Sequence, residues 1–260
     1  MDEIKRISSL EFNVVASGHP FDRKLLVKDY YITLILCLIK DVQGIYFKGG
    51  TALNKIFLNH PRLSEDIDFT ITRDEKEVKD EIFDILIKSG FFKDITEGNN
   101  TDGFARLIIS YSSDLGKGEI FIDLNKKAKL LLASETHKVN HFYSPFIIEF
   151  SFKTIAKEEL VAEKVRAAIT RNKPRDHFDV YKIIHANIPI NLKLAEKKCK
   201  EVGAEFSIIR MFNKAKTLKN RWDKDMAPLI SESISFKEII QFLAKHFKLK
   251  EEKENLKKVK

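Results

Sequence analysis

The chain has 260 residues, of which 43% are hydrophobic and 32% are charged, and its formal net charge is +8. This size and hydrophobic content are ordinary for a globular protein with one large or two smaller domains. The positive charge favours an anionic partner such as nucleic acid, although lysines spread along the whole chain fit a general lysine bias equally well.

Several function classes are disfavoured by simple features of the sequence. Cys37 and Cys199 form neither a disulfide framework nor a metal-binding motif, and residues 1–6 do not resemble the start of a signal peptide. The most apolar run, residues 31–39, is too short to span a bilayer and predicts a buried helix. A reducing cytoplasm is therefore the expected location.

The first part of the chain predicts helices and strands in alternation. Helical spacing of apolar residues predicts helices at residues 22–40, 51–58 and 74–89, the second capped by Thr51 and the third ended by Gly90. Short apolar runs predict strands at residues 45–47, 66–71, 91–95, 105–111, 119–124 and 146–152. Turns are expected at residues 99–100 and 116–118.

The pattern changes after residue 154, where no comparable strand signal follows. Helices are predicted at residues 156–171, 176–185, 191–202, 205–218 and 235–247, with breaks at 172–174 and 187–189. The charged end, residues 248–260, is expected to fray. The sequence thus predicts an α/β (α+β) domain over residues 1–153, with a mixed, largely antiparallel sheet flanked by helices. A helical bundle domain is predicted over residues 154–260.

A glycine turn joins the strand at residues 45–47 to the next helix. Gly49 and Gly50 tolerate positive φ and let a phosphate approach the backbone, and the following helix presents its N-terminal amides to an anion. Thr51 adds a hydroxyl, and Lys48 lies next to the turn. Two glycines alone would favour a plain strand-to-helix turn, but the paired aspartates that follow favour a phosphate site.

Asp66 and Asp68 alternate with apolar residues in a predicted strand, so their side chains project from one face. Neighbouring carboxylates repel each other, and two divalent cations that also bind nucleotide phosphates would relieve that repulsion. Glu65 points to the other face and is given a supporting role. Asp123, at the end of another strand, either completes the metal site and accepts the proton of an attacking hydroxyl, or caps the next turn. The first alternative is favoured.

Arg62 and Ser64 precede the strand of the paired aspartates. Arg62 fits two interpretations about equally well: it orients a carboxylate or contacts a phosphate, or it forms a surface ion pair. Ser64 is included among the candidate nucleotide-binding residues.

Charged residues gather at two places in the predicted helical domain: Glu159, Glu163, Lys164 and Arg166 on one helix, and Arg171, Arg175, Asp176 and Asp179 around the start of the next. Asp176 and Asp179 are three residues apart and share a helix face. One interpretation is surface ion pairing, which contributes little stability. The other is a cleft against the first domain in which Lys164 holds a triphosphate and the arginines and aspartates line the wall. The pattern alone leaves both open.

Together these residues resemble the AbiEii/AbiGii toxin family of nucleotidyltransferases, within the DNA polymerase β-like superfamily. The resemblance runs from about residue 30 to about residue 185, and it rests on residues 48–53, 62–69, 159–171 and 175–181 and on the strand of Asp123. The size and two-part layout also resemble a Helicobacter member of this family, an antigen that joins a nucleotidyltransferase domain to a helical bundle.

The resemblance implies a nucleotidyltransferase domain that uses Mg²⁺ or Mn²⁺ and transfers a nucleotide from an NTP to an acceptor hydroxyl. RNA, specifically the 3′ end of tRNA, is the expected acceptor, and a cognate antitoxin protein or RNA is the expected partner. Two alternatives are protein nucleotidylation and a nucleotide- or RNA-binding module that keeps the fold without transferase activity. The retained carboxylates argue against the binding module.

The resemblance also implies roles for individual residues, with the active site between the two domains. Gly50 and Thr51 would touch phosphate, Lys164 would contact the nucleotide, and Asp176 would take part in catalysis, whereas Asp66 and Asp68 would bind metal. The family often has Gly-Ser where this chain has Gly-Thr at the turn, but threonine keeps the hydroxyl. The separation between the turn and the paired aspartates is also longer than in the superfamily's tightest patterns.

Overall fold

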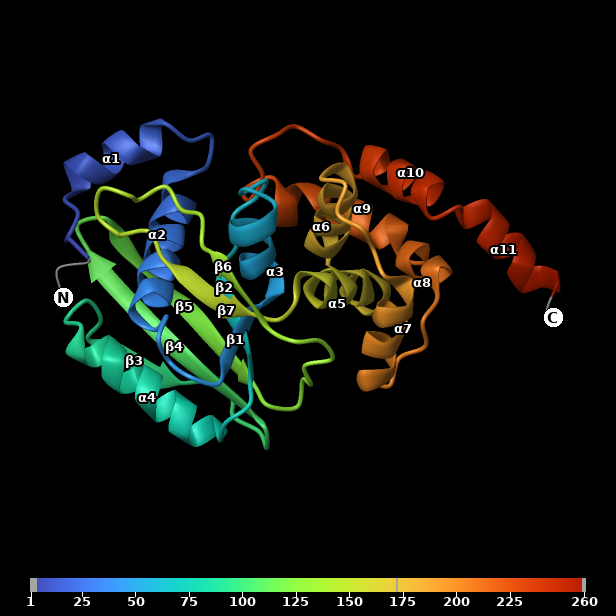
Figure 1. Ribbon diagram of the computed structural model, residues 1–260. Coiled ribbons are helices and arrows are strands. Elements are labelled where there is room, and N and C mark those ends of the chain that lie inside the picture. Colours follow the sequence, from blue (N-terminus) through green and yellow to red (C-terminus); the bar gives the residue numbers. More distant parts are fainter. Residues whose placement is uncertain (1–3, 172, 259–260) are drawn as a thin grey trace. The chain divides into compact units, whose positions relative to one another are not determined.

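The computed structural model describes residues 4–171 and 173–258 (Figure 1). The chain forms two compact units, one that ends at Lys157 and one that starts at Glu158. Within the described ranges, none of the helices combines the length and apolar character needed to cross a membrane. Asn172, in the break predicted between two helices, lies outside the described residues.

A seven-stranded sheet forms the centre of the first unit, with the strand order β3-β4-β5-β2-β1-β7-β6. The strands are β1 Ile45–Lys48, β2 Asp66–Ile71, β3 Asp94–Glu97, β4 Phe104–Ser113, β5 Gly116–Asn125, β6 Glu135–Lys138 and β7 Ser151–Thr154. β2 pairs with β5 and β1 with β7 in parallel, and the other neighbours pair antiparallel. The predicted mixed, largely antiparallel sheet is confirmed.

Helices flank this sheet, as predicted. They are α1 Ser9–Ser17, α2 Arg23–Leu38, α3 Gly49–Ala52, the π-helix η1 Leu53–Phe57, and α4 Glu75–Lys88. α2 contacts β5, α4 contacts β4 and β5, and the two helices contact each other, so they cover the same face of the sheet (Figure 1). Residues 29–37 of α2 are all buried, which confirms that the most apolar run of the chain is a buried helix.

The turn predicted at residues 116–118 from its two glycines is wrong. β4 and β5 are joined by a two-residue turn at residues 114–115, and residues 116–118 already belong to β5. Gly118 pairs with Tyr111, and a Cβ at this glycine would lie 2.4 Å from the Tyr111 hydroxyl. The glycine therefore makes room for a neighbouring ring and does not mark the turn.

Other strand boundaries also differ from the predictions. The strand predicted at residues 91–95 is observed as β3 at residues 94–97, and the one predicted at 146–152 is observed as β7 at 151–154. β6 was not predicted, because its residues Glu135–Lys138 are polar and lie at the edge of the sheet, where they pair only with β7. A polar edge strand lacks the apolar pattern that marks a buried strand.

The second unit is helical, as predicted. Its helices are α5 Lys157–Thr170, which begins at the junction, α6 Pro174–His185, α7 Leu192–Glu201, α8 Ile208–Phe212, α9 Ala215–Met226, α10 Phe236–His246 and α11 Leu249–Lys258. The helix predicted at residues 205–218 is divided into α8 and α9. The prediction that the end frays is wrong for residues 249–258, which form α11 in contact with α8 and α10. Residues 259–260, the last of the predicted frayed end, lie outside the described residues.

Candidate functional site

Four charged residues lie side by side across β1, β2, β5 and β4. Strand pairing sets Lys48 opposite Asp68, Asp68 opposite Asp123, and Asp123 opposite Arg106. Directly paired residues project from the same face of a sheet, and so do residues two apart in one strand, which adds Asp66 to this face. The three predicted carboxylates are therefore brought onto one surface, with a cation at each side.

This surface is on the sheet face opposite to α2 and α4. Ile67 and Phe69 of β2, and Ile122 and Leu124 of β5, alternate with the aspartates and are fully buried. The three aspartates are only partly buried. The prediction that the residue between the paired aspartates faces the core is confirmed. The apolar side chains thus hold the strands while the carboxylates remain accessible.

The glycine turn lies against this row. Gly49 has φ of 75°, and a Cβ there would lie 2.1 Å from Oδ2 of Asp68. A Cβ at Gly50 would lie 2.6 Å from Nη2 of Arg62. The first position requires glycine both for its left-handed backbone and for the space that the carboxylate occupies. The turn therefore lies in direct contact with one of the predicted metal ligands.

Gly49→Ala is expected to lower the free energy of unfolding by roughly 1–3 kcal/mol. The alanine backbone would be strained at a φ of 75°, and its methyl group would displace Asp68. Urea unfolding of the variant would measure this loss. Gly18→Ala is the matched control, since Gly18 has φ of −80° and a Cβ there would make an ordinary 3.5 Å contact. Equal stability of the two variants would contradict the close packing at the turn.

The prediction that Thr51 caps the helix is wrong. The helix begins at Gly49 with Lys48 as its N-cap, and Thr51 is its third residue. The Thr51 hydroxyl donates a hydrogen bond to the backbone carbonyl of Asp66, so it ties the helix to the first residue of β2. The threonine thereby connects the glycine turn to the carboxylate strand.

Asn54 is a residue that sequence reasoning missed. Its Nδ2 donates to the Gly50 carbonyl at 2.7 Å, and its buried Oδ1 has no hydrogen-bond partner within the described part of the chain. The only available signal was its position four residues after Gly50, on the same side of the helix. The buried Asn54 side chain thus stabilises the glycine turn through its hydrogen bond to Gly50.

Arg62 is buried, with only 2% of its surface exposed, so the surface ion pair considered for it is wrong. Its Nη1 donates to the Leu63 carbonyl at 2.9 Å and to Oγ of Ser64 at 3.0 Å. Ser64 is also largely buried, while Glu65 lies 3.9 Å from Lys28. Arg62 therefore fixes the segment that leads into β2.

Arg106 is the second missed residue, and it binds Asp123 with both arms of its guanidinium. Nε lies 2.6 Å from Oδ1 and Nη2 lies 2.7 Å from Oδ2. These hydrogen bonds raise the pKa of Arg106, and the charges of Asp66 and Asp68 act in the same direction. Only the strand register reveals this pair, because Arg106 stands in β4 without a motif around it.

The donor set fits a divalent cation through Asp66 and Asp68. Mg²⁺ prefers oxygen ligands and is usually bound by one or two carboxylates together with substrate phosphates. Within residues 4–171 and 173–258, no group of three or more His, Cys, Asp or Glu is arranged to hold a metal. Asp123 has both oxygens bonded to Arg106, and its part as a third ligand stays a prediction.

A buried ion cluster lies in the second unit. Lys164 Nζ is 3.1 Å from Asp176 Oδ1 and 2.9 Å from Asp179 Oδ2, and neither aspartate is more than 1% exposed. Burial by itself would raise the pKa of Asp176, but the charges of Lys164 and Arg171 lower it below its usual value. Surface pairing is therefore the wrong interpretation for this cluster. Arg175, next to Asp176, is partly buried.

A second buried cluster centres on Lys198 of α7, which sequence reasoning missed. Its Nζ lies 2.6 Å from Glu159, 3.3 Å from Glu163 and 3.2 Å from Glu201. Lys198 and Glu159 are 1% and 0% exposed. Glu159 and Glu163 of α5 thus face a lysine from another helix.

The predicted residues form two groups, one in each unit. The first unit holds Lys48, Gly49, Gly50, Thr51, Ser64, Asp66, Asp68 and Asp123. The second unit holds Lys164, Arg171, Arg175, Asp176 and Asp179. The roles of both groups toward a nucleotide stay predictions.

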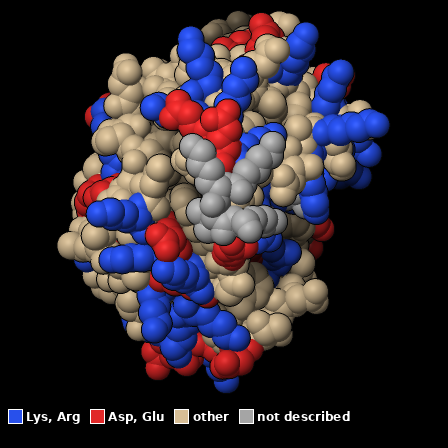
Figure 2. Space-filling view, turned by 90° about the vertical axis from the view of Figure 1, so that its right-hand side faces the viewer, with Lys and Arg blue, Asp and Glu red and all other residues tan. Residues whose placement is uncertain are grey.

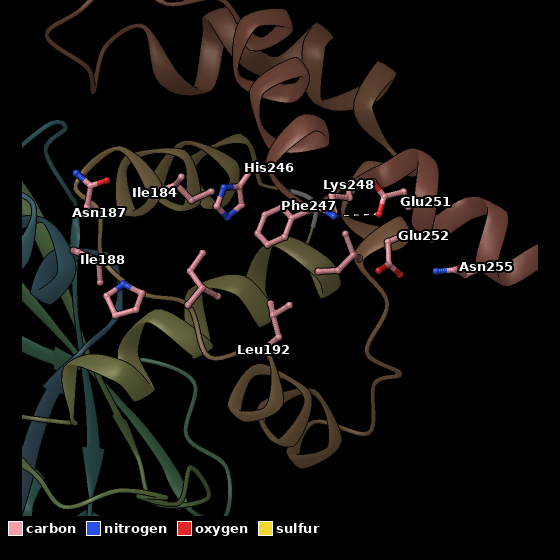
Figure 3. A pocket seen from close by; sticks show the side chains of 13 residues that line it. Ile184, Asn187, Ile188, Leu192, His246, Phe247, Lys248, Glu251, Glu252 and Asn255 are labelled. Carbon is pink, nitrogen blue, oxygen red and sulfur yellow. Dashed lines mark hydrogen bonds and ion pairs between the residues drawn. The ribbon is translucent and has the colours of Figure 1, made fainter.

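The second unit also contains a groove of about 610 Å³ (Figure 3). Ile188, Leu192 and Phe247 contribute apolar surface to it, and Lys248 pairs with Glu251 at 3.3 Å on its rim. None of the predicted site residues lines this groove. The groove and the candidate site are therefore separate features.

Comparisons with known proteins bear on the family of this chain. The fold is similar to the crystal structure of JHP933 from Helicobacter pylori, with 18% identity, a TM-score of 0.62, and coverage of 92% of this chain and 99% of that one. A second H. pylori structure, described as a candidate nucleotidyltransferase, matches with 19% identity, a TM-score of 0.62 and the same coverage. No curated protein matches the sequence.

A family model matches residues 37–243, which include both groups of predicted site residues. Its description is the nucleotidyl transferase AbiEii toxin of type IV toxin–antitoxin systems. The match covers well over half of the chain, so the chain belongs to the AbiEii nucleotidyl transferase toxin family.

Proposed function

We propose that this nucleotidyltransferase-type toxin transfers a nucleotide from an NTP to an acceptor hydroxyl at the surface formed by Lys48, Asp66, Asp68 and Asp123. The observation that carries the proposal is the strand register, which places Asp123 directly opposite Asp68 on the face of the glycine turn. A plain strand-to-helix turn would have no need of three carboxylates beside it.

In this proposal the acceptor oxygen attacks the α-phosphorus, the bond to the leaving phosphate breaks, and pyrophosphate departs with the bonding electrons. Asp66 and Asp68 hold Mg²⁺ or Mn²⁺, which when bound supplies positive charge for the phosphates. The amides of Gly50 and Thr51 and the ammonium of Lys48 bind phosphate oxygens. Asp123 accepts the proton of the acceptor hydroxyl through a lone pair that its two hydrogen bonds with Arg106 leave open.

The family resemblance adds residues of the second unit to this proposal. Lys164 would contact the nucleotide, and Asp176 would take part in catalysis, with Ser64, Arg171, Arg175 and Asp179 as further nucleotide-binding residues. Lys164 already lies between two buried carboxylates, Asp176 and Asp179. Its ammonium is therefore held in a fixed place by two ion pairs, and its contact with the nucleotide is proposed from the family resemblance.

The charge distribution favours RNA as the acceptor. Residues 158–260 contain 24 Lys and Arg against 15 Asp and Glu, whereas residues 1–157 contain 22 against 23. Figure 2 shows many basic side chains on the viewed face, with smaller groups of acids between them. The segment 206–222 has five basic residues and no acidic one. A phosphate backbone is the polyanion that such a surface binds, and the 3′ end of tRNA provides the hydroxyl in this proposal.

Lys216→Glu with Lys219→Glu is expected to weaken tRNA binding about tenfold or more at physiological salt and to reduce its salt dependence. Both lysines are exposed on α9. Filter binding at several salt concentrations would measure the change. Lys93→Glu with Lys117→Glu, which are exposed in the first unit, changes the net charge equally. If both double variants lost the same tRNA affinity, net charge alone would explain the loss, and the surface of α9 would have no special part in binding.

Incubation with each labelled NTP, Mg²⁺ and total tRNA tests the reaction itself. Label in the RNA supports the proposal, and label in protein would favour protein nucleotidylation. Intact NTP binding without any transfer would favour the alternative of a binding module. Relief of growth arrest by a neighbouring gene product would support the proposed antitoxin partner and an action in the cytoplasm.

A further inference from the structure

We propose that Arg106 is a positioning residue that occupies Asp123 and so sets how strongly the carboxylate surface binds a divalent cation. The inference rests on the proposed function, because it concerns the same three aspartates. It adds a residue from β4 that is not part of the glycine turn or of the paired-aspartate strand.

Arg106 binds Asp123 through both oxygens of its carboxylate. Both carboxylate oxygens accept short hydrogen bonds, at 2.6 Å from Nε and 2.7 Å from Nη2. This parallel two-bond geometry is the strongest form of arginine–carboxylate recognition. The Asp123 side chain is 17% exposed and that of Arg106 is 36% exposed, so water reaches the arginine more readily than the carboxylate.

Arg106 is held in place by its surroundings. A Cβ at Gly98 would lie 2.9 Å from the Arg106 side chain, so the missing side chain leaves room for the arginine stem. The Arg106 backbone amide donates to Oδ1 of Asn100 at 3.0 Å, and the guanidinium lies 5.0 Å from the centre of the Phe121 ring. The arginine is therefore a built part of the surface and not a mobile side chain that happens to reach it.

The charge of Arg106 opposes the repulsion among the three aspartates. The register places Asp123 opposite Asp68, and Asp66 opposite Phe121, whose ring is the one below the guanidinium. A divalent cation and the guanidinium are thus alternative counter-ions for the same carboxylates. Removal of the guanidinium should therefore raise the affinity of the carboxylates for a divalent cation. A positive side chain kept at residue 106 should lower that affinity again.

Titration with Mn²⁺ alone, followed by electron paramagnetic resonance of the unbound ion, tests this inference on the full chain. Arg106→Gln is expected to bind Mn²⁺ about tenfold more tightly than the unaltered chain, because one close positive charge is lost. Arg106→Lys, which keeps the charge but loses the two-bond geometry, is expected to show an intermediate affinity. Addition of Asp123→Asn to Arg106→Gln should abolish the gain.

Arg73→Gln is a matched control, because Arg73 is also 36% exposed and also bonds a carboxylate, Glu81, at 2.6 Å. It removes the same charge and should leave Mn²⁺ affinity unchanged. Equal affinities of folded Arg106→Gln, folded Arg106→Lys and the unaltered chain would overturn the inference while leaving the proposed function intact. Absence of Mn²⁺ binding in the unaltered chain and all variants, together with absence of nucleotide transfer, would overturn both.

Discussion

Asp68→Asn is expected to reduce nucleotide transfer by roughly a thousandfold or more, with Asp66→Asn similar, because each replacement removes a charged ligand from the proposed cation site. Asparagine has nearly the same shape, and the strand that carries both residues is held by fully buried Ile67 and Phe69. The fold should therefore persist. Initial rates with labelled NTP and tRNA, beside circular dichroism spectra, would measure both.

Asp94→Asn is the matched control for that loss. Asp94 is exposed at the start of β3, in the same sheet but at its edge, so its variant should transfer at the normal rate.

The combined variant Asp66→Asn with Asp68→Asn should also no longer arrest growth when expressed. Persistent growth arrest, with transfer lost, would show that toxicity comes from binding and not from catalysis.

Lys198→Met is expected to lower the free energy of unfolding of the second unit by about 3–5 kcal/mol. Methionine fills similar space, but the substitution leaves the fully buried carboxylate of Glu159 without the ammonium that lies 2.6 Å from it. Glu163 and Glu201 lose the same partner. Urea unfolding followed by the fluorescence of Trp222, the single tryptophan of the chain, reports on this unit.

Two further variants separate charge burial from general damage to α7. Lys197→Met alters the exposed neighbour and should change stability by no more than about 0.5 kcal/mol. Adding Glu159→Gln to Lys198→Met should restore part of the loss, because the buried charge is then removed. If Lys198→Met were as stable as Lys197→Met, the cluster would contribute nothing to stability.

The sequence predicted local features of the first unit well. β2 was predicted at its observed bounds, because alternation of aspartates with apolar residues is a direct signal of a strand with one buried face. The resemblance to the AbiEii family, built on the glycine turn and this strand, is confirmed by the family match. Both features depend on residues close together in the chain.

Features that depend on distant partners could not be predicted. Arg106 and Asp123 meet because β4 pairs with β5 in one register, and a shift of one residue would have pointed the arginine to the opposite face. Lys198 of α7 meets Glu159 of α5 through helix packing that no local pattern encodes. α11 was missed for a similar reason, since its charged sequence resembles a disordered end and its contacts are with α8 and α10.

The parallel pairing of β2 with β5 also determines when during folding the proposed active surface can form. β4 and β5 are joined by a two-residue turn and can pair early, but Asp68 and Asp123 are more than fifty residues apart in the chain. Closure of so long a loop is entropically costly, so this pairing is expected late. A chain in which β5 has not yet paired with β2 would therefore lack the assembled carboxylates.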